Sequence, residues 1–356
     1  MCTLHDYLES TGYLERIPRP IGPTNAAQVK TRLEEFEGKI EVVAIHFSKN
    51  FDTSEFSGRI NFEPTLRNIT SCGPRNDWDW LQLIYANEEY EDSDISLYNG
   101  GPELQLTDNS LEECLNVTRR LHEVLPTTPF RYTFSLQNCE GEEMKAFVSR
   151  CLVGSYEKVT FCGRFRRTDM FNPDEFDFLM NIVNSETYFE FNCEVPDGFR
   201  HEKAFQFKSF FYHHAHWITL DDLKSLRNHN IVRLGRTNFS NEDVNEFLKS
   251  WAECDEPMMN IFSVYLRTTF EGEGDKCDRK IILAGLEHFS TMEQPAIPNN
   301  PLIYYIKSRM PGKCGELQVH ERKIELHTRT TTDLPKEIQQ EDNDGFELIG
   351  KNEVEQ

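Results

Sequence analysis

Three histidines stand close together at the end of a strand-like stretch, in Tyr212-His213-His214-Ala215-His216. Imidazole nitrogens bind zinc, so this cluster is the first candidate for a metal site. A structural zinc site needs about four well-placed ligands, and one local cluster rarely supplies them. In an extended segment only His214 and His216 would share a face, because side chains alternate along a strand. We therefore expect a strand that runs into a loop, and no metal site.

The acidic run from Asn87 to Asp94 raises a second possibility, because Glu88 and Asp94 could form a pair of catalytic carboxylates. Such catalysis needs two carboxyl groups in different environments across a cleft, and a run of acids on a polar loop gives no such difference. The sequence also contains no G-x-S-x-G nucleophile elbow and no glycine-rich phosphate-binding motif. We therefore expect no catalytic, cofactor-binding or metal-binding residues and no enzyme.

Composition argues against two further classes of partner. The 356 residues carry a formal net charge of -22 at pH 7, which repels polyphosphate, and the basic run Arg164, Arg166 and Arg167 is too short for a nucleic-acid-binding face. No apolar run approaches the roughly 20 residues that span a bilayer, and the N-terminus does not resemble a signal peptide. We expect neither nucleic-acid nor membrane binding. The 10 cysteines form no C-x-x-C pair, and with no secretory signal we expect the cytoplasm, with the nucleus as an alternative.

Beyond about residue 105, segments with helical spacing alternate with segments typical of strands. Asn172-Pro173, Thr219 and Ser240 are expected helix starts, because Asn, Thr and Ser cap helices well and Pro suits the first helical position. Strands are expected to begin at Phe130, Tyr156, Thr187, Asn230 and Asn260. This recurrence at about 30 residues is typical of stacked repeats. The sequence predicts an α/β fold, a leucine-rich-repeat-like curved solenoid of helix–strand units with a short β-rich C-terminal cap.

Three regions follow from these patterns. Residues 1–100 form an N-terminal region, residues 101–330 the repeat domain, and residues 331–356 a polar, acidic tail that we expect to be disordered. In the first region the apolar stretch from Lys39 to Phe47 is expected to form a buried strand that pairs with residues 59–62.

Alternation along the expected strands separates a buried face from an open one. Phe134, Phe161, Phe191, Val232 and Val264 are expected to point towards the helices. Solenoids bind partners with their open face, so the residues between them form the candidate partner-binding face: Thr133, Ser135, Lys158, Thr160, Glu190, Asn192, Arg233, Ser263 and Tyr265.

Two further stretches carry a resemblance to a known family. The first is Trp217, Ile218, Thr219, Leu220 and Asp221 followed by Leu223, and the second is Asp243, Val244, Asn245, Phe247, Leu248 and Trp251. Together they resemble the type 2 F-box-associated domain of a nematode-expanded family of F-box proteins, most clearly over residues 205–266. Trp217 and Trp251 are expected to be core anchors, because aromatic side chains contribute large buried areas.

The resemblance implies a role in protein recognition. In such proteins an F-box binds a Skp-type adaptor of a cullin–RING (SCF-type) ubiquitin ligase, and the associated domain holds the protein to be ubiquitinated. Residues 1–60 contain no segment that resembles an F-box, so the sequence itself does not predict contact with the adaptor or the cullin. Two alternatives remain open: a hydrolase-like enzyme whose site the sequence hides, and a diverged binding protein uncoupled from ubiquitination. The bound protein is not identified by the sequence.

Overall fold

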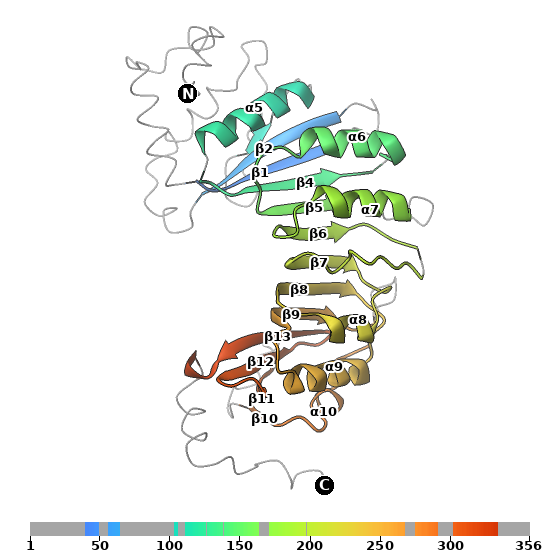
Figure 1. Cartoon of the computed structure of the whole chain (residues 1–356), viewed down its shortest axis with the longest axis vertical. Coiled ribbons are helices and arrows are strands. Elements are labelled where there is room, and N and C mark those ends of the chain that lie inside the picture. Colours follow the sequence, from blue (N-terminus) through green and yellow to red (C-terminus); the bar gives the residue numbers. More distant parts are fainter. Residues whose placement is uncertain are drawn as a thin grey trace. The chain divides into compact units, whose positions relative to one another are not determined.

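The computed structural model describes residues 40–49, 56–64, 103–105, 111–125, 127–137, 139–163, 171–196, 198–267, 275–290 and 302–333. The chain divides into two compact units, residues 1–196 (unit 1) and residues 197–356 (unit 2). Figure 1 labels most of the helices and strands of each unit.

Unit 1 contains a mixed sheet with the strand order β6-β5-β4-β1-β2-β3. Strand β1 pairs in parallel with β4, and β4, β5 and β6 continue the parallel arrangement, whereas β1–β2 and β2–β3 are antiparallel. Three helices occur in the described part of this unit. The bounds are β1 Ile40–Lys49, β2 Phe56–Pro64, β3 Glu103–Gln105, α5 Leu111–Val124, β4 Phe130–Ser135, α6 Gly141–Cys151, β5 Lys158–Cys162, α7 Pro173–Ile182 and β6 Tyr188–Asn192.

Unit 2 contains a second mixed arrangement, with the strand order β7-β8-β9-β13-β12-β11-β10. Strands β7, β8 and β9 are parallel, and every pair from β9 through β13 to β10 is antiparallel. The bounds are β7 Ser209–His214, α8 Leu220–Ser225, β8 His229–Arg236, α9 Asn241–Glu253, β9 Met259–Tyr265, α10 Arg279–Ile282, β10 His288–Ser290, β11 Leu302–Lys307, β12 Lys313–Val319, β13 Lys323–Thr330 and the 3-10 helix Thr331–Asp333.

The expected leucine-rich-repeat-like solenoid is therefore wrong. Helix–strand alternation accounts only for the parallel strands of each unit. Antiparallel strands extend the parallel strands of each unit, and no helix lies between β11, β12 and β13. The strand order in each unit is linear, so neither set of strands closes on itself. A β-α-β crossover also takes about 30 residues, so the recurrence that we interpreted as stacked repeats is equally a property of a parallel α/β sheet.

The expected regions can be located on this architecture. Strands β1 and β2 lie before residue 100, and β4 lies after it. Because β1 pairs with β4, strand pairing crosses the expected boundary at residue 100. The expected tail starts with the 3-10 helix Thr331–Asp333, and residues 334–356 lie outside the described part, as do the acidic run 87–94 and the basic residues at 164–167.

Aromatic side chains form the core between the sheet and the helices of unit 1. Phe134 on β4 stacks on Phe161 of β5, with ring centroids 5.3 Å apart, and meets Phe147 of α6 edge-to-face at 5.9 Å. Phe191 on β6 meets Phe176 of α7 in the same way at 5.0 Å. These rings are fully or almost fully buried, so the strand residues that alternate with them lie on the sheet face away from α6 and α7.

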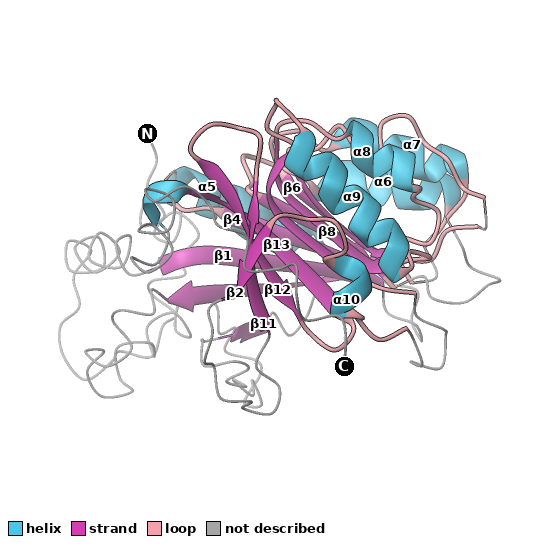
Figure 2. Cartoon of the chain, turned by 90° about the horizontal axis from the view of Figure 1, so that it is seen from below, coloured by secondary structure: helices cyan, strands magenta, loops and turns pink. Residues whose placement is uncertain are grey.

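The core of unit 2 follows the same plan, with α8 and α9 on one side of its strands (Figure 2). Phe247 of α9 packs on Phe262 of β9, with ring centroids 4.4 Å apart, and Trp251 is fully buried. Gly315 on β12 leaves room for the Trp251 ring, because a Cβ atom there would lie 2.7 Å from Trp251 Cη2.

Local sequence signals start the helices as expected. Asn172 caps α7 before Pro173, Thr219 caps α8, and Ser240 caps α9, and each accepts a hydrogen bond from the third helical backbone amide. All are capping boxes, and in α8 and α9 the reciprocal residue is aspartate, Asp222 or Asp243. The three predicted starts are confirmed.

Candidate partner-binding surface

The first motif stretch fixes the turn from β7 into α8. The indole Nε1 of Trp217 donates a hydrogen bond to the carbonyl oxygen of His214 at 2.9 Å. Trp217, Ile218 and Leu223 are buried, whereas Leu220 is half-buried and Asp221 is exposed in the first turn of α8. A carboxylate at this end of a helix is favoured by the helix dipole, so this stretch contributes mainly to structure.

The second stretch fixes α9 on the sheet and holds the segment that follows β9. Val244, Phe247, Leu248 and Trp251 are buried along one stripe. The side chain of Asn245 donates hydrogen bonds to the carbonyl oxygens of Ile282 and Ala284, at 2.7 and 3.0 Å. Sequence reasoning missed this role, although an amide beside an otherwise apolar stripe could have indicated it, because a buried amide needs partners.

In unit 1 the strand register brings six members of the candidate face together. Thr133 lies opposite Thr160, which lies opposite Glu190, across β4, β5 and β6. All six side chains are half-buried and alternate with buried residues: Thr133, Ser135, Lys158, Thr160, Glu190 and Asn192. The surface is therefore polar and partly accessible.

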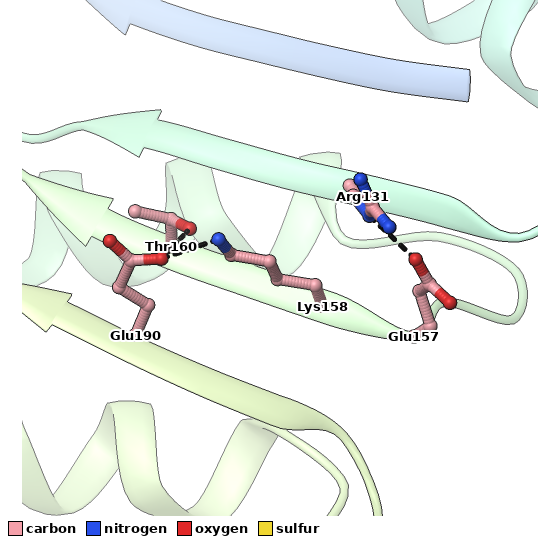
Figure 3. A network of polar contacts seen from close by, with 5 residues as sticks. All are labelled: Arg131, Glu157, Lys158, Thr160 and Glu190. Carbon is pink, nitrogen blue, oxygen red and sulfur yellow. Dashed lines mark hydrogen bonds and ion pairs between the residues drawn. The ribbon is translucent and has the colours of Figure 1, made fainter. Parts of the chain in front are cut away.

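Charges on this surface of unit 1 are paired with each other (Figure 3). Lys158 Nζ lies 2.5 Å from Glu190 Oε2, and the Thr160 hydroxyl donates to the same oxygen at 3.4 Å. Arg131 Nε lies 2.5 Å from Glu157 Oε1. Partly exposed pairs of this kind contribute about 0–1 kcal/mol to stability, so their substitution is expected to leave the fold intact.

Thiol chemistry is not favoured beside this network. Burial, and secondarily the negative charge of Glu190, raises the pKa of the Cys162 thiol to about 11. The thiolate is the reactive form of cysteine, so a raised pKa keeps Cys162 unreactive near neutral pH.

The other three members of the candidate face lie in unit 2. Arg233 on β8 is exposed and lies opposite Ser263 of β9. Ser263 is only 3% exposed, whereas Tyr265 is 39% exposed and the Nζ atom of Lys323 lies 5.6 Å from its ring centroid. Ser263 is thus enclosed by its neighbours, and Arg233 and Tyr265 are the accessible members.

The histidine cluster is placed at the end of β7, as expected. His214 is buried, and burial lowers its pKa to about 4, with smaller contributions from the charges of Arg236, His213 and His216. His213 instead stacks on Phe211, with ring centroids 3.7 Å apart. Within the described residues, no three His, Cys, Asp or Glu side chains are grouped so as to hold a metal ion.

Unit 2 also contains a hollow of about 1000 Å³ beside the start of α9, lined by Asn241, Cys277, Leu302, Val319 and His320 among others. Asn241 uses its side chain to bind the backbone of residues 276 and 278. Burial raises the pKa of Cys277 to about 12, so this thiol is not an activated nucleophile.

None of the described helices is long and apolar enough to cross a membrane.

Comparison with known proteins locates the family resemblance. Residues 199–264 match the family model described as F-box associated, and this range contains both motif stretches. The Skn-1 dependent zygotic transcript 15 protein of Caenorhabditis elegans is 48% identical over 40 residues, which are 11% of this chain and 12% of that protein. The chain therefore matches only a small part of that relative's length. No solved structure matches the chain.

Proposed function

We propose that the protein is a target-recognition component of a cullin–RING ubiquitin ligase. The proposal starts from the match of residues 199–264 to the F-box-associated family model. In this role the open-face residues described above, six in unit 1 and three in unit 2, contact the protein to be ubiquitinated, and a Skp-type adaptor and a cullin are the other partners. The protein would act in the cytoplasm, with the nucleus as the alternative. The match of residues 199–264 is the observation that carries this proposal.

The structural role of the motif residues supports a function in protein recognition more than a catalytic one. Trp217, Asn245 and Trp251 are buried, and Trp217 and Asn245 bond to backbone carbonyls of unit 2. The motif thus stabilises a scaffold, and the open sheet face remains the candidate surface for a partner. Binding to such a face depends on a few well-packed anchors and on shape, not on total area.

Affinity purification of the tagged full chain, followed by quantitative mass spectrometry, tests the proposal. We expect a Skp-type adaptor, a cullin and at least one further protein at constant ratios to the chain. A stable protein partner without adaptor and cullin would contradict the ligase role and support a binding protein uncoupled from ubiquitination. Recovery of no stable partner would contradict recognition altogether.

A further inference from the structure

Arg233 stands out among the charged residues of the open face in unit 2. It lies on β8, between β7 and β9, and its neighbours along the strand, Val232 and Leu234, are buried. Val232 lies opposite Phe262, which packs on α9. Because side chains alternate along a strand, the exposed Arg233 side chain extends from the face away from α9.

Apart from Ser263, which lies directly opposite it on β9, Arg233 is flanked by apolar side chains on this face. Phe211 lies opposite it on β7, and Ile231 and Ile261 face each other one step back along β8 and β9. These three side chains are half-buried, and Tyr265 is 39% exposed. We call Phe211, Ile231, Arg233, Ile261 and Tyr265 the Arg233 patch. A cation at the centre of accessible aromatic and aliphatic side chains is typical of the anchors at protein interfaces.

The nearest carboxylate in the register towards β13 is already engaged. Across the strands, Arg233 lies opposite Ser263, and Ser263 lies opposite Glu325. Glu325 pairs with Lys323 at 2.5 Å and with His320 at 3.4 Å. Burial raises the pKa of Glu325, but the hydrogen bond and charge of Lys323 and the contribution of His320 outweigh it and lower the pKa. Glu325 is thus ionised and its charge is already balanced.

The side chain of Arg233 makes no hydrogen bond or ion pair within the part of the chain that the structure describes. The comparable cation in unit 1, Lys158, is paired with Glu190. The chain has 60 acidic against 38 basic residues, so an unpaired arginine is the less expected arrangement. The Arg233 patch therefore offers one uncompensated positive charge among mainly apolar side chains.

We propose that the Arg233 patch binds a protein segment that presents a single Asp or Glu side chain beside aliphatic or aromatic residues. This inference rests on the proposed recognition function and specifies the chemistry of its target. A guanidinium binds a carboxylate through two parallel hydrogen bonds and is less strongly hydrated than an ammonium group. Apolar flanks that exclude water strengthen this pair. The net charge of -22 repels a long acidic run, so the segment carries one carboxylate and not many.

A displayed library of short random peptides, selected against the folded full chain, tests the proposal and does not require the natural partner. We expect the enriched peptides to share one Asp or Glu next to Leu, Ile, Phe or Tyr. Arg233→Ala should weaken the best of them about 10- to 100-fold, since it removes charge-assisted hydrogen bonds. Lys280→Ala is the matched control, because it removes an exposed positive charge of α10 in the same unit, and it should leave the affinity unchanged.

A charge exchange then tests for direct contact. Arg233→Glu should abolish binding of the acidic peptide, and a peptide with lysine in place of its carboxylate should bind Arg233→Glu better than it binds the wild type. Each variant is first compared with the wild type by circular dichroism and thermal midpoint, to show that it folds. Enriched peptides that lack an acidic residue, or that bind Arg233→Ala as well as wild type, would overturn the inference and leave the recognition function standing. Failure to enrich any peptide would also overturn it, whereas the proposed function is judged separately by recovery of adaptor and cullin.

Discussion

Replacement of Asn245 by alanine should loosen the segment around α10 from α9. The Asn245 side chain is 8% exposed and donates hydrogen bonds to the carbonyl oxygens of Ile282 and Ala284, at 2.7 and 3.0 Å. A typical hydrogen bond contributes about 0.5–1.5 kcal/mol net, so loss of both should lower the free energy of unfolding by about 1–3 kcal/mol. Because Ile282 is the last residue of α10, amide hydrogen exchange should also accelerate there.

Urea unfolding followed by tryptophan fluorescence measures the change, since Trp217 and Trp251 are buried in the same unit. Asn260→Ala is the matched control, because Asn260 is exposed and its side chain makes one hydrogen bond, of 3.2 Å, to Asn230. We expect the control to change the free energy of unfolding by less than about 0.5 kcal/mol. If Asn245→Ala is no more destabilising than the control, or leaves exchange in α10 unchanged, the structural role assigned to this motif residue is refuted.

Three further predictions concern the scaffold of unit 2. Gly315→Ala should destabilise the protein by about 1–3 kcal/mol, because its Cβ would lie 2.7 Å from the Trp251 ring; unchanged stability in chemical denaturation would contradict that packing. Ser240→Ala removes the cap of α9 and should cost about 1 kcal/mol, so an unchanged thermal midpoint would argue against the cap. His214 has a folded pKa of about 4 against 6.5 when unfolded, so the unfolded chain binds the proton first and stability should fall as pH decreases from 6.5 towards 4. His214→Gln should lose less stability over that interval, and equal losses in unfolding titrations would refute the assignment.

The sequence predicted the helix starts because helix capping depends only on residues next to each other in the chain. Asn172, Thr219 and Ser240 satisfy backbone amides within the next three residues, and no distant contact is needed for that. Alternation likewise predicted that Phe134, Phe161 and Phe191 would be buried, and all three are. This prediction depends only on the pleat of each strand.

Sheet topology could not be predicted in the same way. The pairing of β1 with β4 joins residues about 90 positions apart in sequence, Val43 and Phe130 among them, and the run of antiparallel strands from β9 to β10 is set by register and not by local spacing. A recurrence of about 30 residues fits both stacked repeats and a parallel α/β sheet, so the sequence alone favoured the wrong architecture.

For the candidate face, the sequence indicated which side of a strand each residue occupies. It did not indicate which side chains of the neighbouring strands pair with that residue or cover it. The ion pair of Lys158 with Glu190 arises from the register of β5 and β6. Ser263 is buried because a short side chain on a central strand is enclosed by longer neighbours, although alternation alone places it on the open face. The difference between a paired Lys158 and an unpaired Arg233 was therefore visible only in the structure.

The most direct test of the account is the affinity of the purified protein for the partner recovered with it, measured by titration calorimetry. The combined replacement of Lys158, Glu190 and Arg233 by alanine changes only partly or fully exposed side chains, so the fold should persist. We predict that this variant binds the partner at least about tenfold more weakly than the wild type. An unchanged dissociation constant, with the variant folded, would contradict the claim that the open-face residues of the two units contact the partner.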